Sequence, residues 1–164
     1  MMRAMLPYNR SAAVLYAHLW AMGRNPAYYD FENIGGDCTN FASQVLYAGA
    51  GVMDFRPVYG WYYRSLNDRA PAWTGVEFLY NYLTRSTQTP GPVAVEVTQQ
   101  ELEPGDIIQL SFQGQGYQHT PVVVAVGNEI LVAAHSIDSD YRPLSTYSYT
   151  SARFLHILGV YPSS

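Results

Sequence analysis

The stretch GGDCTNFASQ, residues 35–44, contains the one cysteine of this 164-residue chain, at a point where a helix is predicted to begin. Two glycines end the preceding loop, Asp37 is a favoured N-cap residue, and the apolar residues that follow recur at helical spacing. Cys38 is therefore expected in the first helical turn, where free N–H groups and the helix dipole favour the thiolate. We interpret Cys38 as a nucleophile. The alternative, a buried cysteine acting as a small apolar side chain, does not require glycines and polar residues around it.

Apolar periodicity predicts helices in the first half of the chain and strands in the second. The expected helices cover residues 8–22, residues 38–48 and a stretch from residue 76 that opens with the capping box TGVE and has Arg85 in its last turn. Residues 52–72 are expected to be irregular. The expected strands cover residues 93–97, 107–112, 120–126, 130–135 and 154–161. The fold class is therefore α+β, with N-terminal helices packed on an antiparallel sheet, in one domain over residues 1–164.

The composition argues against several classes of partner. The formal net charge is −4, the chain has no lysine, and its nine arginines are scattered, so nucleic-acid binding is disfavoured. No apolar run reaches the length of a membrane span, and the start of the chain is too short before Pro7 for a secretion signal. Both a cytoplasmic location and an extracellular location after processing fit the sequence. Fifteen tyrosines and three tryptophans suit a groove that stacks on sugar or peptide, and equally suit core packing.

A cysteine nucleophile needs a base within hydrogen-bonding reach, and four histidines compete for that role. His18 falls inside the first predicted helix and His156 inside an apolar strand, so both are interpreted as structural. His119 follows a glycine-rich loop and opens a β-branched strand, where its ring can face the helix that carries Cys38. We predict His119 as the base.

The register of the hairpin that follows decides which residue orients the base. If the turn takes residues 127–129, His135 lies opposite Pro121 and shares a face with His119. If the turn takes only residues 127–128, Ser136 lies opposite His119 and His135 points to the other face. We favour the first register and hence His135, with Asp138 and Asp140 as carboxylate alternatives.

Several of these segments together resemble the putative amidase domain family of bacteria. The resemblance covers nearly the whole chain and rests on YNRSAA at residues 8–13, RNP at 24–26, GDCTNFASQ at 36–44, and His119 followed by a valine strand. That family is similar to the papain-like superfamily that includes the NlpC/P60 cell-wall peptidases and the CHAP amidases. The resemblance implies a papain-like fold with nucleophile Cys38, base His119 and a polar third residue that maps to His135. The chain departs from the cell-wall enzymes in having Thr39-Asn40 after the cysteine and a longer hairpin.

These observations predict a cofactor-free cysteine hydrolase of amide or peptide bonds, acting on peptidoglycan or a related peptide through a thioester. The N–H of Cys38 is the expected oxyanion donor, with a second donor from the loop at residues 28–33, which is expected beside the sulfur, or from Gln44. Asp37 is interpreted as a helix cap. The alternatives are an acyltransferase with the same residues and a binding module without turnover. A metal site is disfavoured because no carboxylate or thiol stands at ligand spacing beside His119 and His135. The sequence leaves the oligomeric state open.

Overall fold

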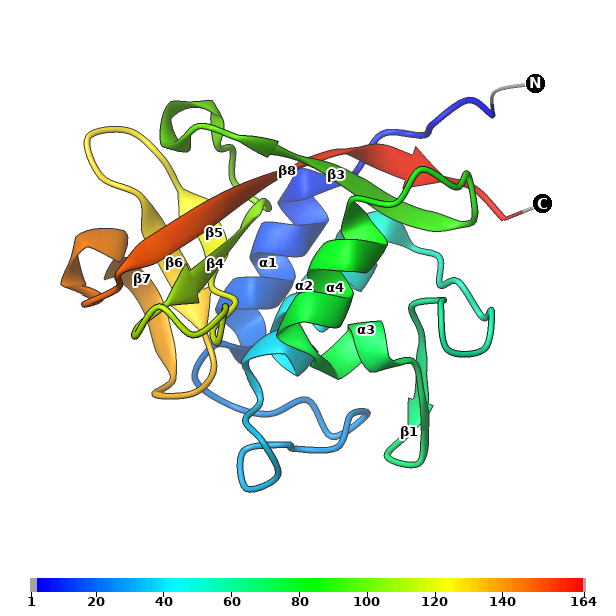
Figure 1. Ribbon diagram of the computed structural model, residues 1–164, viewed down its shortest axis with the longest axis horizontal. Helices are drawn as coiled ribbons and strands as arrows, with labels where there is room; N and C mark the ends of the chain where they lie inside the picture. The colour runs from blue at the N-terminus through cyan, green and yellow to red at the C-terminus, as the bar shows by residue number, and fades with distance from the viewer. Residues whose placement is uncertain (1–2, 164) are drawn as a thin grey trace.

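The computed structural model describes residues 3–163 and confirms a mixed α+β fold with an antiparallel sheet (Figure 1). The four helices are α1 (Arg10–Trp20), α2 (Cys38–Ala50), α3 (Pro71–Thr74) and α4 (Val76–Leu83). A two-stranded hairpin is made by β1 (Tyr63–Ser65) and β2 (Asp68–Arg69). The larger sheet contains β3 (Gly91–Val97), β4 (Ile107–Ser111), β5 (Val122–Ala125), β6 (Leu131–Ala134), β7 (Ser139–Pro143) and β8 (Ser151–Tyr161). Its strand order is β3-β8-β4-β5-β6-β7, and every neighbouring pair is antiparallel.

The first two helices lie close to their predicted positions. Helix α1 starts after Asn9, whose side chain accepts a hydrogen bond from the N–H of Ala12, and it ends before Gly23. Helix α2 starts at Cys38 as predicted and ends at Gly51, whose φ of 74° is the left-handed conformation of a C-cap glycine. Gly49 does not end the helix. It lets the helix approach Tyr8, because a Cβ at this position would lie 2.4 Å from Cε1 of the tyrosine ring.

The middle of the chain is more regular than predicted. Residues 52–72, expected to be irregular, contain the β1–β2 hairpin and the start of α3. Helix α4 begins at Val76, but no side chain caps it, so the predicted capping box is wrong. The hydroxyl of Thr74 instead accepts a hydrogen bond from Nε of Arg69. Arg85 lies beyond the end of α4 and not in its last turn.

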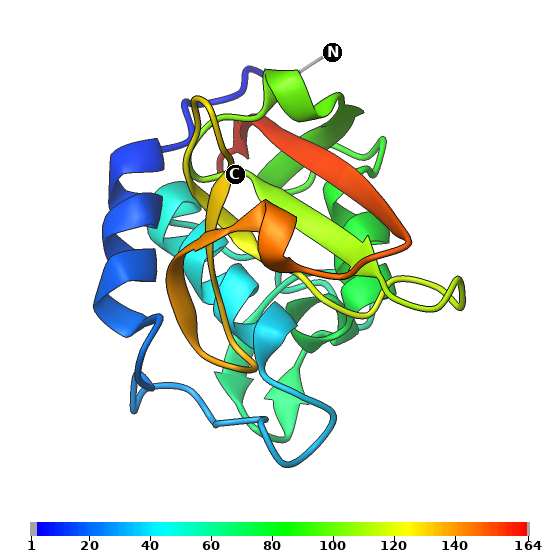
Figure 2. The same ribbon diagram turned by 90° about the vertical axis from the view of Figure 1, so that its left-hand side faces the viewer.

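The curled sheet packs against the helices on one face and encloses a second, smaller apolar cluster on the other (Figure 2). Val122, Ala133 and Ile107 join the helices in the main apolar cluster. Val123, Val132, Ile108 and Leu110 form a second cluster inside the curl, closed by Leu144 and Tyr147. The alternation of side chains along β4, β5 and β6 therefore supplies two cores from the same strands.

The hairpin of β5 and β6 contains a register shift that the sequence did not reveal. Next to the turn, Ala125 pairs with Leu131, which is the register of a three-residue turn. Farther from the turn, Val122 pairs with Ala133, which is the register of a two-residue turn. Continued from this pair, the second register places Ser136 opposite His119. The prediction that His135 lies opposite Pro121 is therefore wrong, because a bulge inside the hairpin moves every later pair by one residue.

Candidate active site

Cys38 is buried at the N-terminus of α2, beside the backbone that leads into β5. Its Sγ lies 3.9 Å from the carbonyl oxygen of Gln118 and 3.7 Å from the hydroxyl of Thr39. That hydroxyl is 3.1 Å from the hydroxyl of Thr120. The glycines at 35–36 have φ values of 88° and 99°, a conformation that glycine adopts without strain. The glycine pair thus turns the chain sharply into the helix that carries the sulfur.

The pKa of Cys38 is raised, and the prediction that the helix N-terminus lowers it is wrong. Burial is the main cause, and the neighbouring carboxylate of Asp37 acts in the same direction. Hydrogen bonds from Thr39 and from the backbone of Thr120 lower the pKa but do not outweigh burial. A helix dipole contributes about 0.3–1 kcal/mol at an exposed position, which is less than the effect of full burial on a thiolate. The resting side chain is therefore a neutral thiol.

His119 lies three residues before the start of β5, at an irregular pairing with β4. The N–H of Gln118 donates to the carbonyl of Leu110, whose own N–H donates to the carbonyl of His119. Two residues thus face one, as in a β-bulge. The imidazole is largely buried, and its ring centre lies 5.5 Å from that of Tyr147. Burial lowers the pKa of His119 to about 4, with a smaller contribution from the positive charge of Arg142, so the ring is neutral at pH 7.

Cys38 and His119 line the same cleft, which has a volume of about 450 Å³. Its walls are formed by residues 35–36, 118–119, 136–137 and 146–148, together with Phe112 and Arg142. Within residues 3–163, no hydrogen bond joins Sγ of Cys38 to a ring nitrogen of His119. The structure therefore brings the predicted nucleophile and base to one cleft as two neutral groups.

His135 lies outside this cleft, and both of its ring nitrogens contact other groups. Its Nδ1 is 2.6 Å from Oδ2 of Asp37, and its Nε2 is 2.9 Å from the carbonyl oxygen of Trp20. The ring is fully buried and stacks on Phe41, with 4.2 Å between ring centres. Both ring nitrogens thus face groups other than His119. His135 therefore helps to fix the position of Asp37, the residue that precedes Cys38.

Asp37 is a buried carboxylate that ties the loop to the helix. Its Oδ1 accepts hydrogen bonds from the N–H of Phe31 at 2.8 Å and from Nδ2 of Asn40 at 3.0 Å. Asp37 occupies the N-cap position of α2 as predicted, but its side chain makes no cap hydrogen bond. Burial alone would raise the pKa of Asp37, but the hydrogen bonds from His135, Asn40 and Phe31 lower it below its ordinary value. The group is therefore ionised.

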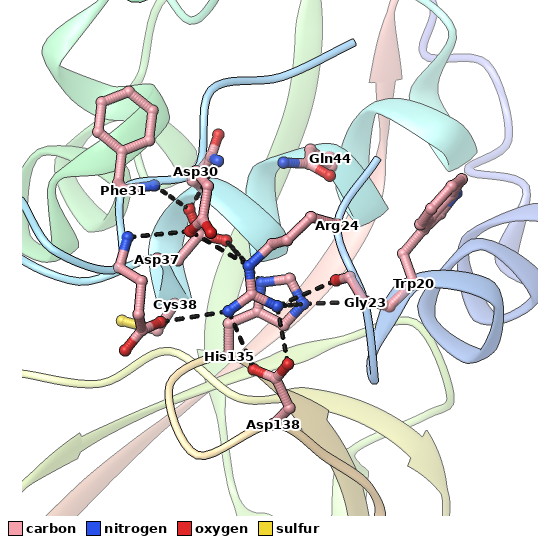
Figure 3. A network of polar contacts seen from close by, with 12 residues as sticks. Trp20, Gly23, Arg24, Asp30, Phe31, Asp37, Cys38, Gln44, His135 and Asp138 are labelled. Atoms are coloured by element: carbon pink, nitrogen blue, oxygen red, sulfur yellow. Dashed lines mark hydrogen bonds and ion pairs between the residues drawn. The ribbon is translucent and has the colours of Figure 1, made fainter. Parts of the chain in front are cut away.

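Arg24 joins this carboxylate to the neighbouring loops (Figure 3). Its guanidinium lies 2.8 Å from Oδ2 of Asp138, 3.2 Å from Oδ1 of Asp30 and 3.6 Å from Oδ2 of Asp37. Figure 3 shows the guanidinium between these carboxylates and Cys38 beside Asp37. The segment after α1, the loop at residues 28–33 and the segment after β6 are thus linked to the start of α2.

Of the remaining candidates for the third polar residue, the two aspartates form salt bridges and the serine lines the cleft. Asp138 pairs with Arg24, and Asp140 lies 2.8 Å from Nδ1 of His18. Neither carboxylate contacts His119. Ser136 is the member of this group that lines the cleft. The interpretation of His156 as structural is confirmed, because its Nδ1 lies 2.9 Å from a carboxylate oxygen of Asp106.

Neither of the two expected second oxyanion donors lines the cleft. The side-chain oxygen of Gln44 accepts a hydrogen bond from the hydroxyl of Tyr16, and Gln44 does not line the cleft. The loop at residues 28–33 also lies apart from the cleft. The N–H of Tyr29 donates to the hydroxyl of Tyr63, and Phe31 is buried in the main apolar cluster. Residues 35–36, not 28–33, form the loop beside the sulfur.

Comparison with known proteins identifies the family. The model of the family described as "Putative amidase domain" matches residues 7–158. The chain belongs to this family. This amidase domain is 37% identical over 162 residues to the uncharacterized protein YhbB of Bacillus subtilis (strain 168). The match covers 92% of this chain but only 50% of YhbB, so the chain spans about half the length of that relative. No solved structure matches the chain at a significant level.

The family description indicates hydrolysis of an amide bond, and the cleft is the place in this amidase domain where a thiol and an imidazole meet. Across residues 3–163, no group of three histidine, cysteine or acidic side chains is placed to hold a metal ion. In the same part of the chain, no helix is long and apolar enough to cross a membrane.

Arg142 and Tyr147 are among the residues that line the cleft of the amidase domain without having been singled out from the sequence. They belong to a segment after β6 whose strand β7 was not predicted. The guanidinium of Arg142 lies over the Tyr147 ring, 3.7 Å from its centre. Neither residue carries a local sequence signal, because the curl of the sheet alone brings this segment to the cysteine.

Proposed function

We propose that this amidase domain hydrolyses amide or peptide bonds, in peptidoglycan or a related peptide, through a thioester on Cys38. The observation that carries the proposal is the shared cleft of Cys38 and His119 in a member of an amidase family. We also propose a papain-like arrangement, with the nucleophile at the start of a helix and the base at the start of a strand. The position of Cys38 at the first residue of α2 supports it.

The protonation states favour general-base catalysis over a resting ion pair. The raised pKa of Cys38 and the lowered pKa of His119 leave both groups neutral near pH 7. His119 therefore takes the thiol proton as the sulfur attacks the carbonyl carbon, and returns it to the leaving amine. Such hydrogen bonds are often long before substrate binds, so the missing bond between Sγ and the ring agrees with this sequence of steps.

The third polar residue of the proposal differs from the sequence prediction. His135, Asp138 and Asp140 all have partners outside the cleft. Ser136 lines the cleft and falls opposite His119 in the continued register, so we propose Ser136 as the polar neighbour of the base. We propose His135 as a positioning residue that acts on Cys38 through Asp37.

The direct test is turnover by Cys38→Ala and His119→Ala, assayed on a peptide p-nitroanilide and on peptidoglycan. Both variants should lose activity, whereas the control His18→Gln, which changes a histidine outside the cleft, should retain it. Mass spectrometry of the wild type quenched during turnover should show an acyl group on Cys38. If Cys38→Ala turned over these substrates as fast as the wild type, the proposal would be wrong. A wild type that binds these substrates without cleaving them would instead identify a binding module.

A further inference from the structure

The cleft of Cys38 is lined by a positive charge and, among the residues that the structure describes, by no negative one. Arg142 is the charged residue of this lining, and the other walls are glycines, aromatic rings, hydroxyls, an amide and Ile137. The thiol of Cys38 and the imidazole of His119 are neutral near pH 7. The cleft is therefore positive in a chain whose formal net charge is −4. A cleft lined by one sign of charge attracts ligands of the opposite sign.

The charge of Arg142 is not paired with a carboxylate. Arg142 forms no salt bridge within residues 3–163, whereas Arg24 and Arg56 each pair with an aspartate. Its Nε donates to Oγ1 of Thr146 at 2.8 Å, and its Nη2 donates to the carbonyl of Thr146 at 3.3 Å. Its Nη1 has no acceptor in the described part of the chain and is open to solvent. One edge of the guanidinium is thus occupied by Thr146, and the edge formed by Nη1 and the second hydrogen of Nη2 is free.

A strand and an aromatic ring hold Arg142 in place. The residue lies on β7, where it pairs with Val132 of β6, and its side chain is half-buried. Its guanidinium carbon lies 3.7 Å from the centre of the Tyr147 ring, which is a cation–π contact. Because this contact and the hydrogen bonds to Thr146 already restrict the side chain, a ligand that binds Arg142 has little side-chain entropy left to remove.

The guanidinium lies within the reach of one amino-acid residue from the proposed base. The centre of the Tyr147 ring is 3.7 Å from the guanidinium carbon of Arg142 and 5.5 Å from the centre of the His119 ring. The guanidinium carbon and the imidazole centre are therefore no farther apart than these two distances added together. A hydrogen bond at each end takes about 3 Å of this separation. A single residue is long enough to span the remainder.

We propose that Arg142 binds a carboxylate of the substrate, on one of the two residues joined by the scissile amide, and so selects acidic peptides over neutral ones. This inference rests on the proposed function. The free edge of the guanidinium can donate two parallel N–H···O bonds to a carboxylate, which a point charge cannot reproduce. Arg142 is thus a specificity-determining residue, and the reacting groups remain Cys38 and His119.

Alkylation of Cys38 tests the anion site without turnover. Iodoacetate and iodoacetamide both react with the thiolate and differ in a carboxylate against a carboxamide, so the ratio of their rate constants is independent of the pKa of Cys38. At low salt, Arg142→Gln should lower the ratio of iodoacetate to iodoacetamide by at least about threefold, the effect of one unit charge about 6 Å away in water. The control Arg64→Gln removes a positive charge outside the cleft and should leave the ratio unchanged. In the wild type the ratio should fall as salt is added, which requires no variant to fold.

Turnover of matched peptides tests the selection itself. Acetyl-Ala-Ala with a free carboxylate is compared with its carboxamide, and acetyl-Glu-Ala-amide with acetyl-Gln-Ala-amide, so that the two pairs place the acid after and before the scissile bond. Released amine gives the rate, and mass spectrometry gives the bond cleaved. The wild type should prefer the acidic member of at least one pair by about 10–100-fold in kcat/KM, mainly through KM. Arg142→Gln should bring this preference close to one, and Arg142→Lys should retain part of it.

The outcomes for Arg142 and for the proposed function are distinguishable. If the wild type cleaves both members of each pair equally well, or Arg142→Gln keeps the acidic preference, the inference about Arg142 is wrong and the thiol mechanism stands. A purely structural role of Arg142 would slow both members of a pair equally, which would also overturn the inference. If Cys38→Ala turns over as fast as the wild type, the proposed function is wrong. If the wild type cleaves none of these peptides, the alkylation ratio decides whether Arg142 attracts a carboxylate to the cleft.

Discussion

Replacing Asp37 with alanine should unfold the protein at markedly lower urea concentrations. The carboxylate is fully buried and accepts hydrogen bonds from the N–H of Phe31, from Asn40 and from His135. Asn40 has a second acceptor in the carbonyl of Tyr29, so two donors lose their acceptor entirely. At about 1–3 kcal/mol for each unsatisfied buried donor, the expected loss is about 2–6 kcal/mol.

Urea unfolding followed by tryptophan fluorescence measures this loss. Thermal unfolding should show a fall of about 2–4 °C for each kcal/mol lost, hence about 4–24 °C for a loss of about 2–6 kcal/mol. The matched control is Asp37→Asn, which retains one oxygen for Phe31 and Asn40 and should lose less than half as much. A loss below about 1 kcal/mol in Asp37→Ala would refute the reasoning, because at least two buried donors would then be left without cost.

The same carboxylate gives the stability a defined pH dependence. Because the fold lowers the pKa of Asp37, its contribution is fully present above the unfolded pKa of about 3.9 and is lost as the pH falls through the folded pKa. The stability of Asp37→Ala should therefore fall less steeply than that of the wild type on acidification. If the free energy of unfolding fell equally steeply with decreasing pH in the two proteins, ionised Asp37 would have no role in stability.

Three further results are expected. Gly49→Ala should lose about 1–3 kcal/mol in urea unfolding, because its Cβ would lie 2.4 Å from the Tyr8 ring, whereas Gly23→Ala meets nothing within 4 Å and should be neutral. Arg142→Gln should move the acid limb of kcat/KM to higher pH, because Arg142 helps to hold the pKa of His119 near 4; an unchanged limb would contradict that influence. Iodoacetamide should label Cys38 with an apparent pKa above the free value of about 8.5, and a lower value would show that burial does not dominate.

The parts of the fold encoded by local pattern were predictable. The glycine pair and the helical spacing after it located the start of α2 at Cys38, and the β-branched runs located β3, β5 and β6. His119 was expected to face Cys38 because it follows a glycine-rich loop and opens a β-branched run, and the two residues do line one cleft. These features depend on neighbours within a few residues, which the sequence displays directly.

The parts that depend on distant contacts were not predictable. The bulge in the β5–β6 hairpin changes which residue faces His119, and no residue type marks it. The raised pKa of Cys38 arises mainly from burial, to which Gln118, 80 residues away in the chain, contributes. Arg142 and Tyr147 line the cleft only because the sheet curls, and local sequence pattern does not show that curl. Sequence reasoning thus predicted the two residues that share the cleft, Cys38 and His119, and missed the residues around them.

The burial of Cys38 has a consequence for the durability of the protein. Peroxide converts thiolates to sulfenic acid far faster than it converts thiols, and irreversible sulfinic and sulfonic acids follow. A sulfur that stays protonated until a carbonyl group is beside it presents little of the oxidisable form between turnovers. The same shielding that slows proton removal from Cys38 should therefore keep its sulfur reduced in an oxidising medium.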